Sequence, residues 1–267
     1  MRSLASARDD KESLIFMPVL YIVATPIGNL EDISMRALRV LGSVDLVLCE
    51  DTRVTRKLLD HYKIKTPTSS YHEHTDDRKT NEIIDMLAQG KNLALVTDAG
   101  TPGISDPGGK LIYAVIEKFG VGADPESPVQ IESIPGPSAV TAALSISGVP
   151  TDKFIFMGFP PHKKGRQTFL KKIIESEYPV VVYESKHRII KFLEELKRIG
   201  EGKVKIEGEK EEEFKGKKKI DLTSIVVCRE LTKMHETVYR GDLDSIIEKI
   251  EGSADAQRGE FVVIIGK

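Results

Sequence analysis

Short apolar runs rich in β-branched residues recur along the chain and alternate with stretches that have the spacing of amphipathic helices. In the stretch 81–89, for example, Ile83, Ile84, Leu87 and Ala88 share one helical face. Continuous apolar strands between such helices are typical of a buried sheet with parallel strands. The pattern therefore predicts the α/β fold class, with strands at 19–24, 44–49, 92–97, 129–134, 153–159, 179–185, 223–228 and 259–266.

A break in the pattern near Pro135 predicts a boundary between two domains. Five strand or helix units precede it, and the run 134–137 combines two prolines with a glycine. We expect an N-terminal α/β domain at 18–134 and a C-terminal α/β domain at 135–267. Residues 1–17 have no apolar core, so they indicate a disordered N-terminal extension and not a secretory signal.

Composition narrows the class of protein. Hydrophobic residues make up 40% of the chain and charged residues 30%, as in a globular protein with a core. No apolar run approaches the roughly 20 residues of a membrane span, so we expect a cytoplasmic protein without membrane contact. Cys49 and Cys228 each end an apolar run and are predicted to be core thiols without a disulfide.

The segment 201–221 differs from the rest of the chain. It holds seven lysines and seven acidic residues and few apolar ones. Such a segment cannot bury a face, so we predict a mobile surface loop or hairpin and assign it no function.

Glycine- and proline-rich loops follow three predicted strands, at 24–30, 98–108 and 135–139. Ligands of open α/β sheets bind at the carboxyl ends of strands, between loops of this kind. Any one loop could be an ordinary tight turn, but three together favour a shared ligand site. The run 103–110 is not a P-loop, because it has one residue too many before Lys110 and is followed by Leu111.

These loops belong to eight motifs that occur in a fixed order from about residue 18 to 266: ATPIGNLEDIS (24–34), CEDTR (49–53), YHEHT (71–75), VTDAGTPGISDPG (96–108), IPGPSA (134–139), GF (158–159), YESKHR (183–188) and RELTKMHE (229–236). Together they resemble the tetrapyrrole methylase family, and in it the branch that methylates the ribose of a cytidine in the decoding region of 16S rRNA.

The resemblance implies two α/β domains with S-adenosylmethionine in the cleft between them. It also implies a homodimer, with 16S rRNA or the small ribosomal subunit as partner. The sequence departs from the family pattern in three places, which are the extension 1–17, the charged segment 201–221 and the end at Lys267 without a helical tail.

The resemblance also implies a set of cofactor-binding residues. Gly100, Thr101 and Pro102 stand where the family holds the methionine part of the cofactor, and backbone groups should dominate because the aligned side chains are small. The full set is Pro26, Gly100, Thr101, Pro102, Ile104, Ser105, Ser138, Ala139, Tyr183, Glu184, Arg229, Glu230 and Leu231.

A ribose hydroxyl is weakly acidic, so its methylation is helped by a general base. The candidates are Glu50, Asp51, Glu184 and Glu230, since each lies at a predicted strand end, but the base could be none of them. An equally good interpretation of the 50–53 run is a capped helix start.

The remaining histidines give no catalytic or metal assignment. His72 and His74 flank Glu73, but no third ligand has suitable spacing, so no metal is expected. His235 is interpreted as pocket-lining or structural.

A net charge of −2 means that RNA contact requires a local basic patch. Three clusters follow predicted strand ends and could rim the same cleft, although each alone could be a solvated helix face. The predicted RNA contacts are Arg53, Arg56, Lys57, Lys163, Lys164, Arg166, Lys186 and Arg188.

Two competing functions remain. A methylase acting on a tetrapyrrole carbon is disfavoured by the CEDTR, YHEHT and RELTK motifs. A non-catalytic RNA-binding or assembly protein is disfavoured by the intact glycine and proline loops, which RNA binding alone would not need.

Overall fold

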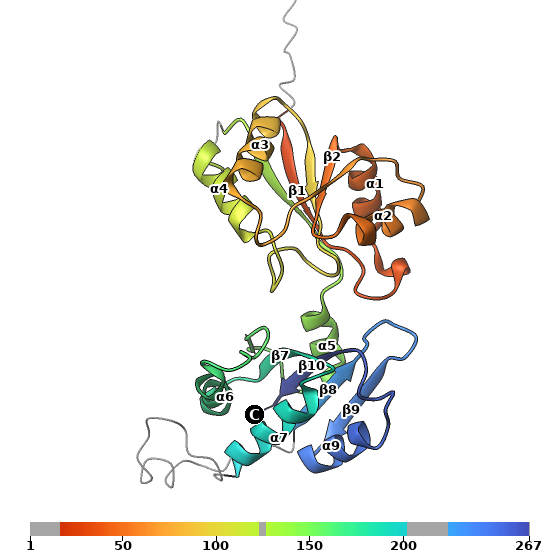
Figure 1. The fold of residues 1–267 in the computed structure, drawn as a ribbon, viewed down its shortest axis with the longest axis vertical. Coiled ribbons are helices and arrows are strands. Elements are labelled where there is room, and N and C mark those ends of the chain that lie inside the picture. The colour runs from red at the N-terminus through yellow and green to blue at the C-terminus, as the bar shows by residue number, and fades with distance from the viewer. Residues whose placement is uncertain (1–16, 123–126, 202–223, 267) are drawn as a thin grey trace, which may run out of the picture.

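The structure is a computed structural model that describes residues 17–122, 127–201 and 224–266. The expected extension lies outside this range apart from its last residue. The charged segment lies outside it apart from Glu201. Two five-stranded sheets organise the described chain, one above the other in Figure 1.

The first sheet is entirely parallel, as predicted, with the strand order β3-β2-β4-β1-β5. Its strands are β1 (Val19–Val23), β2 (Leu46–Cys49), β3 (Thr68–Ser70), β4 (Leu93–Leu95) and β5 (Gln130–Ile134). Its helices are η1 (Leu30–Asp32), α1 (Met35–Ser43), α2 (Thr52–His61), α3 (Asp77–Ala88) and α4 (Gly109–Phe119).

Helices cover both faces of this sheet. The buried faces of α1 and α2 pack on one side and those of α3 and α4 on the other, which gives two apolar clusters (Figure 1). In α3 the predicted face buries Ile83, Ile84 and Leu87, while Ala88 is exposed. A sheet buried on both faces explains why its strands read as unbroken apolar runs.

The second sheet is mixed, with the order β6-β7-β10-β8-β9. Only β6 and β7 are parallel, so the expectation of parallel strands throughout is wrong here. Its strands are β6 (Ile155–Phe156), β7 (Val180–Ser185), β8 (Ile225–Arg229), β9 (Thr237–Gly241) and β10 (Glu260–Ile265), and its helices are α5 (Ala139–Ser147), α6 (Arg166–Glu175), α7 (Ile189–Gly200) and α9 (Leu243–Glu251).

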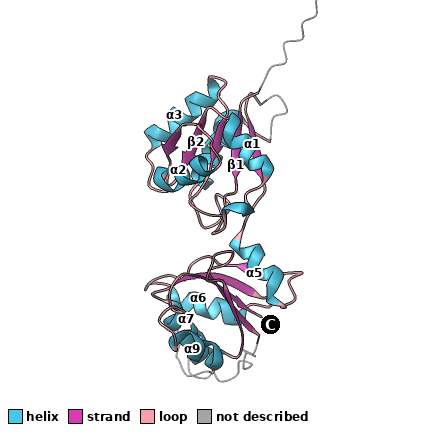
Figure 2. Ribbon diagram, turned by 90° about the vertical axis from the view of Figure 1, so that its right-hand side faces the viewer, coloured by secondary structure: helices cyan, strands magenta, loops and turns pink. Residues whose placement is uncertain are grey.

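The physical reason for the difference lies in two connections. A short loop joins β8 to β9, and an antiparallel pair needs no more than that, whereas a parallel pair needs a crossover. The last strand, β10, then inserts between β7 and β8 and runs against both. Helix α5 packs on one face of this sheet, and α6, α7 and α9 pack on the other (Figure 2).

The described chain passes from the first sheet to the second once, between the end of β5 at Ile134 and the start of α5 at Ala139. The predicted boundary falls within this link, and the division into domains at that point stays a prediction. Cys49 and Cys228 are buried and form no disulfide, as expected for core thiols.

Candidate functional site

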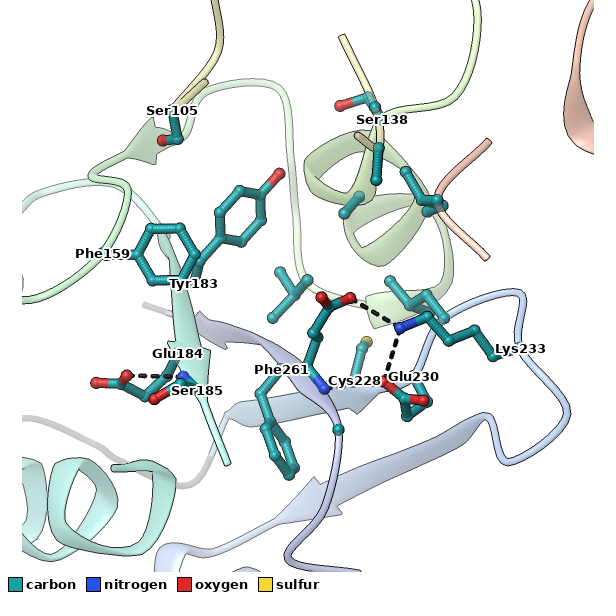
Figure 3. A pocket seen from close by; sticks show the side chains of 18 of the residues that line it. Ser105, Ser138, Phe159, Tyr183, Glu184, Ser185, Cys228, Glu230, Lys233 and Phe261 are labelled. Atoms are coloured by element: carbon teal, nitrogen blue, oxygen red, sulfur yellow. Dashed lines mark hydrogen bonds and ion pairs between the residues drawn. The ribbon is translucent and has the colours of Figure 1, made fainter. Parts of the chain in front are cut away.

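A cavity of about 610 Å³ lies between loops of the first sheet and strand ends of the second (Figure 3). Its volume is in the range of cavities that hold a cofactor-sized molecule. From the first sheet and the link it is lined by Ile27, Ala99, Gly100, Thr101, Ile104, Ser105, Asp106, Ser138 and Ala139. From the second it is lined by Phe159, Tyr183, Glu184, Ser185, Lys186, His187, Cys228, Glu230, Leu231, Lys233, Gly259, Glu260, Phe261 and Val262.

The loop after β4 forms the first wall of the cavity and is fixed by backbone hydrogen bonds. The amide of Thr25 donates to the Gly100 carbonyl at 2.9 Å, and the Gly100 amide donates back at 3.0 Å. The Thr101 hydroxyl donates to the Pro137 carbonyl at 3.2 Å, which ties this loop to the link. With φ at 84°, Gly100 adopts a left-handed conformation that only glycine takes without strain.

This wall fits the small-residue cradle expected for S-adenosylmethionine. A Cβ atom on Gly100 would still lie 3.6 Å from Ile27, so the bare Cα leaves open space at the cavity wall. Apolar side chains of Ile104, Leu231 and Phe261 line the same cavity.

Aromatic rings form part of the opposite wall. The Tyr183 ring lies 5.4 Å from the Phe159 ring and 4.9 Å from the Phe156 ring, measured between centroids. Phe159 is half exposed and lines the cavity, so its ring is accessible to a bound ligand. Burial, together with the charge of Asp106, raises the pKa of the Tyr183 hydroxyl to about 12, so this hydroxyl stays protonated.

Glu230 lies at the cavity but is fully engaged. Its Oε1 atom accepts from Lys233 Nζ and from the Glu260 amide, both at 2.9 Å (Figure 3). Burial favours the neutral form, but these two donors outweigh it and lower the pKa of Glu230. A Cβ atom on Gly259 would lie 2.6 Å from Glu230 Cδ, so only glycine leaves room for this carboxylate.

Glu184 also lines the cavity, yet its carboxylate is buried in an ion-pair cluster. Its side chain is 0% exposed and lies 2.9 Å from Arg188 Nε. Arg166 is 4.0 Å from the same carboxylate and 2.7 Å from Glu195. The two guanidinium groups also donate to the carbonyls of the loop that carries Phe159, at Pro161 (3.0 Å) and Pro160 (3.1 Å).

This cluster corrects two predictions about RNA contact. Arg166 is buried, so its guanidinium cannot reach a phosphate in solution. Arg188 is mostly buried and committed to Glu184. By contrast, Lys163, Lys164 and Lys186 are exposed, and Lys186 borders the cavity.

Three residues of the expected cofactor set do not line the cavity, namely Pro26, Pro102 and Arg229. The two prolines are buried next to lining residues. Arg229 is buried, and its guanidinium donates to the carbonyls of Arg258 (2.6 Å), His235 (3.1 Å) and Asp255. These hydrogen bonds hold the loops around the site in place. The other ten residues of the set do line the cavity.

The run after β2 starts helix α2. Asp51 accepts from the Arg53 amide at 2.8 Å and pairs with its guanidinium at 2.6 Å, which holds the pKa of Asp51 at about 2. Asp51 therefore caps the start of α2, as in the second interpretation of the 50–53 run. Glu50 lies outside the cavity lining, and burial followed by the charge of Asp98 raises its pKa. Arg56 donates to Thr68 at 3.1 Å, and neighbouring Lys57 is exposed.

Sequence reasoning missed several lining residues that lie inside quoted motifs. Asp106 and Phe159 belong to the runs 96–108 and 158–159, and Lys233 belongs to 229–236. Burial, followed by the negative charges of Glu50 and Asp98, raises the pKa of Asp106 to about 7. Strand β10 contributes Glu260, Phe261 and Val262 to the lining, and none of the quoted motifs includes these residues.

Two searches of the described ranges concern other kinds of site. No three His, Cys, Asp or Glu side chains in these ranges are grouped so that they could hold a metal ion. No helix in them has the length and apolarity that a membrane span requires.

Comparison with known proteins gives the family. The family model for Tetrapyrrole (Corrin/Porphyrin) Methylases matches residues 19–247. A Synechocystis protein named ribosomal RNA small subunit methyltransferase I is 41% identical over 93% of this chain and 79% of its own length. A Thermotoga maritima protein of the same name is 37% identical over 93% of this chain and 98% of its own.

Solved structures show the same fold. A cobalt precorrin-4 methyltransferase of cobalamin biosynthesis superposes with a TM-score of 0.60 at 18% identity, over 94% of this chain and 95% of its own. A diphthine synthase gives 0.62 at 15%, over 93% and 90%. The chain belongs to the tetrapyrrole methylase family. It is therefore a methyltransferase, and S-adenosylmethionine is its methyl donor.

Proposed function

We propose that this protein methylates the 2′-hydroxyl of a cytidine ribose in the decoding region of 16S rRNA. The observation that carries the proposal is the name shared by relatives that are 37–41% identical over 93% of the chain, together with a cavity lined by residues of the motifs quoted above. The competing tetrapyrrole substrates rest on the description of the family as a whole and on structures under 20% identical, and a likeness that distant supports the fold alone.

The methyl donor supplies an activated methyl group, so the protein contributes positioning and exclusion of water. In the proposal the loop at Gly100 and Thr101 binds the methionine part through backbone groups. Phe159 and Tyr183 form the aromatic wall, and Ile104 and Leu231 shield the donor from water. All of these residues border one cavity, as the proposal requires.

The RNA surface in this proposal consists of exposed lysines and arginines around the cavity and the end of β2. They are Arg53, Lys57, Lys163, Lys164 and Lys186, with Arg56 at the edge of the group. Such cations position the phosphate backbone, while contacts at the cavity select the nucleotide and its 2′-hydroxyl. We also propose a cytoplasmic homodimer with domains at 18–134 and 135–267.

The test incubates the purified protein with labelled S-adenosylmethionine and either naked 16S rRNA or assembled small subunits. Ribose methylation is then mapped by resistance to alkaline cleavage. We expect one cytidine of the decoding region to become resistant. Label on a base, on no RNA, or on an added tetrapyrrole precursor would contradict the proposal.

A further inference from the structure

Four carboxylates line the cavity, and three of them are held by cations. Glu184 pairs with Arg188 at 2.9 Å, Glu230 with Lys233 at 2.9 Å, and Glu260 with the same lysine at 2.8 Å. In each of these three a cation already occupies the carboxylate, so the carboxylate is not free to take a proton from a ligand. The fourth carboxylate is Asp106.

Asp106 differs from the others in its surroundings. It is partly buried, and within the described part of the chain no hydrogen bond or ion pair engages its carboxylate. The charged or titratable groups that face it are Glu50 after β2, Asp98 after β4 and Tyr183 on β7. None of these is a cation.

The loop that carries Asp106 is held in place at both ends of its tip. The Gly103 amide donates to the Pro107 carbonyl at 3.2 Å, and Ser105 adopts a left-handed conformation with φ at 60°. A Cβ atom on Gly158 would lie 3.0 Å from the Ser105 hydroxyl, so the loop abuts the second domain. Asp106 therefore stands at a fixed point between the cavity and the carboxyl ends of β2 and β4.

We propose that the carboxylate of Asp106 is a catalytic residue, which accepts the proton of the ribose 2′-hydroxyl during methyl transfer. The O2′ atom forms a bond to the methyl carbon as the carbon–sulfur bond breaks, and the bonding pair of the broken bond stays on sulfur. The hydroxyl proton passes to Asp106 and from there to water. This assignment rests on the proposed function, because it needs a hydroxyl acceptor.

The surroundings suit this role. With a pKa of about 7, Asp106 is partly ionised at neutral pH, and its ionised form binds a proton far better than an ordinary aspartate does. A general base works best when its pKa lies near the working pH. The Tyr183 hydroxyl, whose pKa is about 12, stays protonated and does not compete for the proton.

The main test is the pH dependence of single-turnover methylation with saturating donor and RNA. In the wild type the rate should rise through pH 7 and then level off. In Asp106→Asn the rate should fall by about 100-fold or more and the rise should vanish. Asp85→Asn, an exposed change on α3, is the matched control and should keep the wild-type profile.

Two further measurements separate a catalytic role from a structural one. In the ligand-free wild type, carboxyl carbon NMR should show an aspartate that titrates near pH 7, and Asp106→Asn should lack it. Glu50→Gln removes a negative neighbour, so it should move the midpoint of the methylation profile to lower pH. Calorimetry with S-adenosylmethionine checks that each variant is folded.

The outcomes are distinct. A folded Asp106→Asn protein that keeps the wild-type rate and profile overturns the assignment. So does an Asp106 carboxyl that titrates near pH 4, or a pH-dependent rise that is lost in Glu50→Gln and kept in Asp106→Asn. A wild type that binds the donor but transfers no methyl group to rRNA ribose refutes the proposed function itself.

Discussion

The Nε atom of Arg188 lies 2.9 Å from the carboxylate of Glu184, whose side chain is completely buried at the end of β7. The same guanidinium donates to the Pro160 carbonyl at 3.1 Å, next to Phe159. One ion pair thus joins the central part of the second sheet to the loop that supplies an aromatic wall of the cavity. Its energetic weight can be measured.

Replacing Arg188 by methionine should lower the free energy of unfolding by about 3 kcal/mol, because among the described residues the nearest cation left to the buried Glu184 is Arg166 at 4.0 Å. Urea unfolding followed by circular dichroism measures the change. The control is Lys191→Met, since Lys191 is 66% exposed and lies 4.0 Å from Glu195, and it should cost less than about 1 kcal/mol. Equal losses in the two variants would contradict the burial argument.

Gly100→Ala should weaken S-adenosylmethionine binding about tenfold or more, because the added methyl group enters the cofactor wall. The left-handed backbone also costs about 1–2 kcal/mol of stability. Gly90→Ala has the same backbone cost, with φ at 89° and no atom within 4 Å of the added Cβ, and does not line the cavity. Titration calorimetry should show lost affinity in the first variant only. Unchanged affinity in folded Gly100→Ala would refute the assignment of this loop.

Changing Lys163 and Lys164 together to alanine should weaken RNA binding without changing cofactor affinity. Two lost phosphate contacts on single-stranded RNA should reduce the salt slope of binding by about 1.4. The control pair is Lys91→Ala with Lys118→Ala, two exposed lysines, of which the first precedes β4 and the second lies in the last turn of α4. If both pairs change the slope equally, the effect comes from net charge, and the local RNA surface is wrong.

Asp106→Asn should stabilise the fold at pH 8. The pKa of Asp106 is raised from 3.8 to about 7, so its contribution to stability is present below pH 4 and is lost as the pH rises through 7. At pH 8 the ionised group therefore lowers the free energy of unfolding, by less than the full value of about 1.36 kcal/mol per pKa unit because solvent screens a partly exposed carboxylate. Urea unfolding at pH 8 and at pH 4 should show the gain at the higher pH only. A gain of the same size at both values would point to packing instead of ionisation.

Much of the fold could be predicted because a strand that is buried on both faces appears in the sequence as an unbroken apolar run. The runs at 19–24 and 259–266 both became strands. The two strands that were missed, β3 and β9, are short or only partly buried and carry polar residues, so they have no such run. The predicted strand directions were wrong in the second sheet. They depend on where β10 inserts, and an apolar run does not encode that position.

The cofactor wall could be predicted from motifs, since ten of the thirteen expected residues line the cavity. Side-chain roles could not, because they depend on partners that are distant in sequence. In the sequence Arg166 belongs to a basic cluster, but in the structure it is buried and forms an ion pair with Glu195, which lies 29 residues away in the chain. Asp106 belongs to a quoted motif, but its raised pKa comes from burial and then from the approach of Glu50 and Asp98, which only the folded chain provides.

The single passage of the described chain between the two sheets gives the cavity a mechanical property. Its walls come from two bodies, each built around one sheet, and between Ile134 and Ala139 one short length of the described backbone joins them covalently. A molecule that contacts both walls adds a second, non-covalent connection between the two bodies, so their relative motion becomes restricted when it binds. Part of the binding free energy then goes into restraining the relative motion of the bodies. Affinity for the methyl donor should therefore report the stiffness of the link as well as the contacts in the cavity.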